Sequence, residues 1–187
     1  MTAGILWRPG IGDPTWIGWI TVVAYVVAIF SCWRTALLAR EKNGGIKSEP
    51  PAMWFASVVI LFLFGVNKQL DLQTAFIQFG GQVALHEGWY EHRRQVQIIF
   101  VMLLGVALAL ALIMVGRKQQ PFFQRHPLIL IGGVFLAAFT FLRAAIFNHA
   151  DEFVGVNMGE GEWMASLELI GIGCFIVASV KAAKERP

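Results

Sequence analysis

Residues 95–116 read QVQIIFVMLLGVALALALIMVG, an apolar run without a single ionisable side chain. A helix needs about 20 such residues to cross a bilayer core of roughly 30 Å. Because that core holds no water, a spanning segment must satisfy its backbone polar groups internally, as an α-helix does. This stretch therefore predicts a transmembrane helix and indicates the class of the whole chain.

Other apolar runs of similar length lie on both sides of this one. The chain of 187 residues is 57% hydrophobic and 14% charged, whereas a soluble domain carries about 25% charged residues. We expect five spans, at about 15–39, 51–79 with an outward polar extension, 95–116, 127–149 and 163–181. Residues 1–187 are thus expected to form one integral membrane domain of the all-α polytopic class.

Two long segments of the chain follow the same plan. Residues 51–116 and 127–181 each begin with a proline, run into a polar connection and return to a basic end. This pattern indicates two helical hairpins of like orientation. We expect the hairpins to form a four-helix bundle, with the N-terminal span 15–39 on its periphery.

Most lysines and arginines lie in three segments that five spans place on one side of the membrane. They are Arg34, Arg40, Lys42, Lys47, Arg117, Lys118, Arg125, Lys181, Lys184 and Arg186. Cytoplasmic connections carry an excess of basic residues. The sequence therefore predicts a multi-pass cell-membrane protein (in a bacterium, of the inner membrane) with the N-terminus outside and the C-terminus in the cytoplasm. We expect the basic excess to contact membrane lipids and not nucleic acid.

Ionisable residues also lie within the expected spans, near their outer ends. Glu168 follows Trp163 by five residues, and Arg143 precedes the outer end of span 127–149 at a similar depth. A charged side chain at such a position is costly and faces either a partner or a polar cavity. We expect Arg143 to pair with Glu168, and Lys68 to pair with Asp71 three residues later.

These residues and the outer connections are expected to converge on an outward-facing pocket of histidine, carboxylate and arginine side chains. The candidate catalytic residues are His149, Asp151, Arg143 and Glu168; the candidate metal ligands are His86, Glu87, Glu91 and His149; and the other pocket residues are Asn67, Lys68, Asp71, Arg93 and Arg94. His149 is the first choice, because a neutral imidazole ligates a metal or accepts a proton near neutral pH.

The residue pattern leaves the chemistry of this pocket open. Histidines and carboxylates suit a divalent metal, although His86 and His92 are six residues apart and lie on different helix faces. A haem between His149 and His86 or His92 would lie half exposed at the outer edge. Acid–base chemistry without a metal is a third option, with His149 and a carboxylate as the base and an arginine holding a phosphate or carboxylate.

Two classes of function fit these features. One is an enzyme or binding protein that acts on a lipid headgroup or a small anion in the outward pocket. The other is a non-enzymatic subunit whose polar end docks a membrane-complex partner or a second copy in a homo-oligomer. The two classes differ in which substitutions would impair the protein: those in the pocket, or those on the outer connections.

The predicted topology is tested by cysteine labelling in a background in which Cys32 and Cys174 are replaced by serine. An impermeant thiol reagent applied to intact cells should modify a cysteine at Glu160 and should spare one at Lys184, because the two positions lie on opposite sides of the membrane. Labelling at Lys184 with protection at Glu160 would reverse the assignment of inside and outside.

Overall fold

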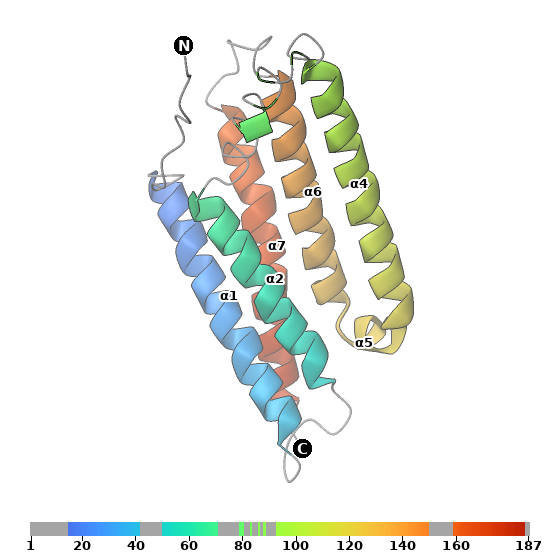
Figure 1. Cartoon of the computed structure of the whole chain (residues 1–187). Coiled ribbons are helices and arrows are strands. Elements are labelled where there is room, and N and C mark those ends of the chain that lie inside the picture. The colour runs from blue at the N-terminus through green and yellow to red at the C-terminus, as the bar shows by residue number, and fades with distance from the viewer. Residues whose placement is uncertain are drawn as a thin grey trace.

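The computed structural model describes residues 15–41, 50–70, 93–149 and 159–185, with isolated positions at 79, 80, 83, 86 and 88. Of residues 93, 94, 97, 144–149 and 159–162 it describes the backbone only. The helices are α1 (Trp16–Arg40), α2 (Pro51–Leu70), α4 (Arg93–Lys118), α5 (Gln120–Arg125), α6 (Pro127–His149) and α7 (Gly159–Lys184) (Figure 1). The prediction of an all-helical chain is confirmed for the described residues.

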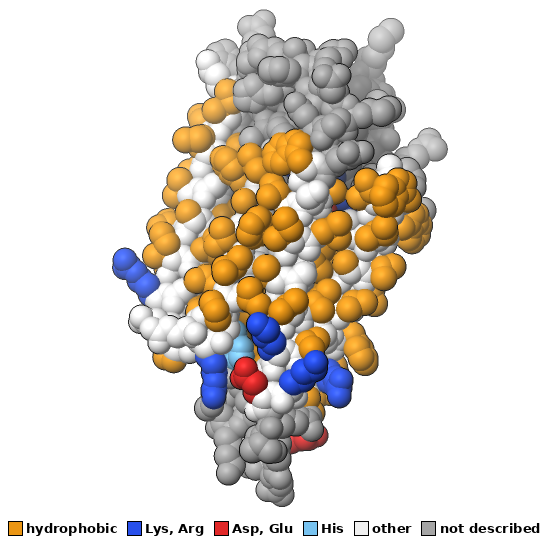
Figure 2. All heavy atoms as spheres, turned by 180° about the vertical axis from the view of Figure 1, so that it is seen from behind, with side chains coloured by type: hydrophobic (Ala, Val, Ile, Leu, Met, Phe, Trp, Pro, Cys, Tyr) orange, Lys and Arg blue, Asp and Glu red, His pale blue; other side chains and the backbone are white. Residues whose placement is uncertain are grey.

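Four of these helices are long and apolar enough to cross a membrane: α1, α2, residues 98–118 of α4 and residues 163–184 of α7. Helix α6 adds a shorter apolar stretch, Pro127–Arg143. By helix length and hydropathy the chain is a multi-pass membrane protein. Figure 2 shows hydrophobic side chains covering most of one face, with lysines and arginines gathered towards one end. The exposed cations at the corresponding helix ends are Arg34, Arg40, Arg117, Lys118, Arg125, Lys181 and Lys184.

The helices do not lie side by side in chain order. Helix α1 packs along both α2 and α7, α7 packs along α6, and α4 packs on α6. The prediction that the N-terminal span lies on the periphery is therefore wrong. The peripheral helix is α4, whose only buried side chain among those described is Val101.

Small residues on α1 allow this central position. Its buried face consists of Gly18, Thr21, Tyr25, Ala28, Cys32, Thr35 and Ala36. In a membrane, helices associate through close van der Waals packing of small residues and through interhelical hydrogen bonds. The hydroxyl of Thr35 lies 3.1 Å from the backbone carbonyl of Ser179 on α7, and 2.9 Å from that of Ser31 on its own helix. Its proton is shared between an intrahelical bond and one that joins α1 to α7.

Helices α6 and α7 approach closely at a pair of glycines. A Cβ atom added to Gly132 would lie 2.8 Å from the backbone oxygen of Gly171, and one added to Gly171 would lie 3.2 Å from the oxygen of Gly132. A side chain at either position would push the two helices apart. The glycines are thus required by interhelical distance and not by an unusual backbone conformation.

An aromatic cluster joins α2 to the connection between α4 and α6. The ring of Trp54, which is fully buried, lies 5.5 Å from that of Phe122 and 5.2 Å from that of His126. The backbone N–H of His126 donates to the carbonyl of Phe122 and ends α5, and Pro127 then begins α6. Proline is favoured at the first position of a helix because its missing N–H would have no partner there. This cluster packs the basic end of the bundle.

The close approach of α6 and α7 gives a test by thermal unfolding in detergent. Gly132→Ala should lower the stability by about 1–3 kcal/mol, because the added methyl group overpacks the contact with Gly171. The matched control is Gly173→Ala on the same pair of helices, where an added Cβ meets nothing within 4 Å. If both variants unfold at the same temperature, the glycine contact does not hold α6 against α7.

Candidate functional site

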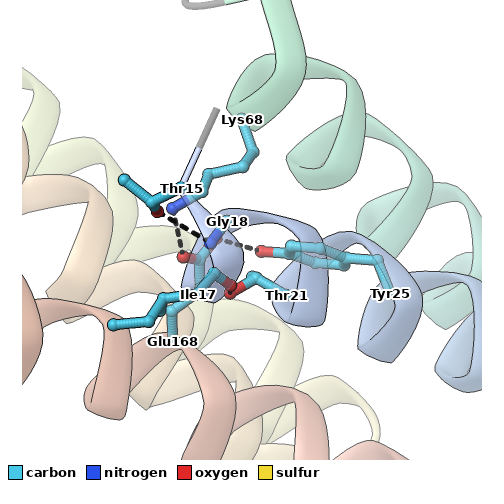
Figure 3. A network of polar contacts seen from close by, with 7 residues as sticks. All are labelled: Thr15, Ile17, Gly18, Thr21, Tyr25, Lys68 and Glu168. Carbon is cyan, nitrogen blue, oxygen red and sulfur yellow. Dashed lines mark hydrogen bonds and ion pairs between the residues drawn. The ribbon is translucent and has the colours of Figure 1, made fainter. Parts of the chain in front are cut away.

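A buried polar network lies at the end of the bundle opposite the exposed cations. The Nζ atom of Lys68 on α2 lies 3.1 Å from Oε2 of Glu168 on α7. The hydroxyl of Tyr25 on α1 donates to Oε1 of the same carboxylate over 3.0 Å. Figure 3 shows Lys68 and Tyr25 converging on Glu168 from two different helices. Their exposed fractions are 6% for Lys68, 2% for Tyr25 and 0% for Glu168, so all three side chains are buried.

The depth of the network follows from helix geometry. Glu168 lies five residues beyond the half-exposed Trp163, or about 7.5 Å along the axis at 1.5 Å per residue. Tyr25 lies nine residues beyond the exposed Trp16, or about 13.5 Å along α1. Long side chains on a helix point back towards its N-terminus, so the hydroxyl of Tyr25 returns to the level of Glu168. The network is therefore set below the tryptophans at this end of the bundle, within the apolar part of the helices.

Residues from four helices surround the side chains of the network. A Cβ atom at Gly65 on α2 would lie 3.5 Å from Cγ of Tyr25, at ordinary van der Waals distance, so this part of α2 packs directly against the tyrosine side chain. The hydroxyl of Thr21, one turn before Tyr25, donates to the carbonyl of Ile17 over 2.9 Å. The ammonium group of Lys68 also lies 5.9 Å from the centre of the Phe139 ring on α6, a contact of the cation–π type. Four helices thus contribute to the surroundings of one ion pair.

The carboxylate of Glu168 receives one donor on each oxygen. A buried ion pair is stable only when its geometry is good and its remaining hydrogen-bonding sites are satisfied. Lys68 supplies the compensating charge and Tyr25 supplies a neutral donor. Removal of either partner would leave one oxygen of the carboxylate without a hydrogen-bond donor in an apolar environment.

The predicted partner of Glu168 was Arg143, and the structure corrects this. Among the described residues, the cation within ion-pair distance of the carboxylate is Lys68. Arg143 is half-buried on α6, one turn beyond Phe139, and is close enough for its charge to act on the hydroxyl of Tyr25. The three helices α2, α6 and α7 offer two cations at similar depth, and rotation of the helices about their axes decides which one meets the carboxylate.

The other predicted site residues differ in what the structure describes. Asn67 is half-buried beside Lys68, and His86 is exposed. His149, Arg93 and Arg94 lie on described helices, but their side chains are outside the description, and Asp71, Glu87, Glu91, His92 and Asp151 are outside it altogether. The predicted pairing of Lys68 with Asp71 therefore stays a prediction. Within the described part of the chain, no three His, Cys, Asp or Glu side chains are grouped so as to hold a metal ion.

Tyr25 is the network residue that the sequence analysis missed. Its signal was its position on α1, where it interrupts a helix face otherwise built from small residues, with Thr21 before it and Ala28 after it. A tyrosine in such a place must bury its hydroxyl, and a buried hydroxyl needs a hydrogen-bond partner. That requirement would have pointed to the carboxylate of the last span.

Comparison with known proteins adds no relative: no protein-family model, no curated protein and no solved structure matches the chain.

The pairing of Lys68 with Glu168 is tested by a double-mutant cycle on stability in detergent. Lys68→Met and Glu168→Met should each cost about 3–5 kcal/mol, because each removes one partner of a buried ion pair. The double variant should cost less than either single variant, since neither charge remains. Lys181→Met, which removes an exposed lysine at the other end of the bundle, is the matched control. Additive effects of the two substitutions would contradict the pair.

Proposed function

We propose that this multi-pass protein has five spans, with its N-terminus outside and its C-terminus in the cytoplasm, and that the polar network is the floor of an outward-facing site for an anionic group. The ligand is the headgroup of a lipid or a small anion. The topology is supported by the exposed lysines and arginines at one end of the bundle, since basic residues mark the cytoplasmic side. The network then lies in the outer leaflet.

The observation that carries the proposal is the buried pair of Lys68 and Glu168 beside Arg143. Ionisable side chains inside a span are expensive, and by default they mark a functional site. An ion pair that served only to join helices would stabilise the fold little, because hydrophobic residues of similar size do so equally well or better. The cost of placing these charges in the outer leaflet supports a role in binding.

The chemistry of the two cations favours an anionic ligand. Lysine and arginine donate hydrogen bonds and accept none. The planar guanidinium of arginine matches carboxylate and phosphate groups with two parallel hydrogen bonds. The ammonium group of Lys68 on α2 lies 5.9 Å from the centre of the Phe139 ring on α6. Arg143 lies one turn beyond Phe139 on the same helix. A ligand oxyanion that reached Arg143 from outside would therefore also approach the ammonium group of Lys68.

The position of His149 is compatible with chemistry on a bound ligand. It ends α6, six residues beyond Arg143, which is about 9 Å further out along the helix axis. A histidine at that level would stand at the outer mouth of the site, above the cations. We propose His149 as the acid–base residue of the site and Asp151 as the carboxylate that orients it. With these two roles the protein would be an enzyme that acts on the bound ligand.

The anion site is tested by binding measurements on purified protein in a zwitterionic detergent. The protein should bind the short-chain lipid dihexanoyl-phosphatidylglycerol in preference to dihexanoyl-phosphatidylcholine. Arg143→Met should weaken that binding by about tenfold or more, the effect of losing a charge-assisted bidentate contact. Arg117→Met, at the basic end, is the matched control and should leave binding unchanged.

The opposite results are equally specific. If wild-type protein binds neither the anionic lipid nor inorganic phosphate, the outward anion site is wrong, and the function as a partner-docking subunit becomes the better proposal. If Arg143→Met and Arg117→Met weaken binding equally, the anion is held by general surface charge and not by the network.

A further inference from the structure

We infer that Glu168 is an internal competitor of the ligand: its carboxylate occupies, on Lys68, the place that an incoming carboxylate or phosphate oxygen would take. This inference rests on the anion site proposed above and names what controls its occupancy. Binding would then be an exchange, in which the ammonium group of Lys68 moves from the oxygen of Glu168 to an oxygen of the ligand.

The two oxygens of Glu168 are held independently, which makes an exchange feasible. Oε2 is bound by Lys68 on α2, and Oε1 is bound by Tyr25 on α1. When Lys68 leaves, the carboxylate keeps the hydrogen bond from Tyr25 and therefore keeps its place. Lysine carries its charge on a flexible four-carbon chain, so its ammonium group can change partner without movement of the helix.

The packing of the helices imposes little resistance to this exchange. Helix α2 packs extensively along α1, and α7 packs extensively along α1 and α6, whereas α2 and α7 are not among the extensively packed pairs of described helices. Lys68 is the charged contact from α2 to α7. Breaking it therefore leaves the three main helix interfaces in place. The contact behaves as a bond between side chains and not as part of a packed surface.

The charge of Glu168 lowers the affinity for any anion. An incoming oxyanion has to replace a carboxylate that is already paired, and it leaves that carboxylate in an apolar place with a single neutral donor. Burial of such an uncompensated charge is unfavourable. Replacing the carboxylate by a neutral amide of the same shape removes this cost, retains an acceptor for Tyr25, and removes the negative charge that competes with the ligand for Lys68.

The decisive variant is Glu168→Gln, measured beside wild type with two probes, dihexanoyl-phosphatidylglycerol and inorganic phosphate. The variant should bind the probe that occupies the site about tenfold more tightly than wild type does. The reason is that the ligand no longer has to replace the charge-assisted hydrogen bond between Lys68 and Glu168. Its melting temperature should also rise more on addition of the probe. Tighter binding of the lipid alone assigns a headgroup, and tighter binding of both probes assigns a free anion as well.

The control is Glu41→Gln, which removes one exposed carboxylate at the basic end and should bind as wild type does. If wild type binds the probe and Glu168→Gln binds it equally or more weakly, the competitor role is wrong while the anion site stands. If neither protein binds, the anion site itself is wrong.

A second variant covers the case in which Glu168→Gln does not purify as a monodisperse protein. Glu168→Asp keeps the charge but withdraws the carboxylate from Lys68 by one methylene group. Its affinity for the anionic probe should then exceed that of wild type by a smaller factor. An affinity equal to that of wild type would overturn the competitor role.

Discussion

The buried carboxylate of Glu168, which is bonded by Lys68 and Tyr25, is the group around which three helices meet at this end of the bundle. Each ion loses several kcal/mol of hydration when it is buried, so the pair persists only with close geometry and a further donor for the carboxylate. Tyr25 supplies that donor. Its ring reaches the carboxylate because α1 lies against both α2 and α7, and the small residues on the buried face of α1 allow this close packing. Three helices thus contribute to satisfying one carboxylate.

The positions of helices and the depth of charged residues depend on distance along the chain, and they were predictable from the sequence. The apolar runs located α1, α4, α6 and α7 to within a few residues, because the thickness of a bilayer fixes the length of a span. The start of α2 was also located, whereas the predicted extension of that span over residues 71–78 lies outside the described residues. The same reasoning placed Lys68 and Glu168 near the outer end of their spans and identified Glu168, together with Arg143, as a costly charge in need of a partner. The all-helical class and the grouping of cations at one end of the described helices likewise follow from composition and spacing.

Features that depend on rotation about a helix axis were not predictable in this way. Arg143 and Lys68 lie at similar depths, so depth alone could not decide which of them meets Glu168, and the predicted pairing with Arg143 was wrong. The spatial order of the helices was also missed, because two hairpins suggested a bundle from which α1 was left out. The small residues of α1, among them Ala28 and Ala36, contradicted that choice, since a helix that faces lipid all round has no need of a small-residue face.

The two ends of the bundle differ in a way that bears on the class of function. A pathway through the membrane places polar groups near the midplane, where the substrate passes. In the described core, the large side chains between the network and the basic end are hydrophobic, namely Leu61, Leu136, Ile172 and Phe175, and the buried threonine and serines there bond to backbone carbonyls. The basic end is packed by the rings of Trp54, Phe122 and His126. If Lys68 holds the proposed anion, that anion meets hydrophobic side chains beneath it, which supports the proposal of a site at one membrane face.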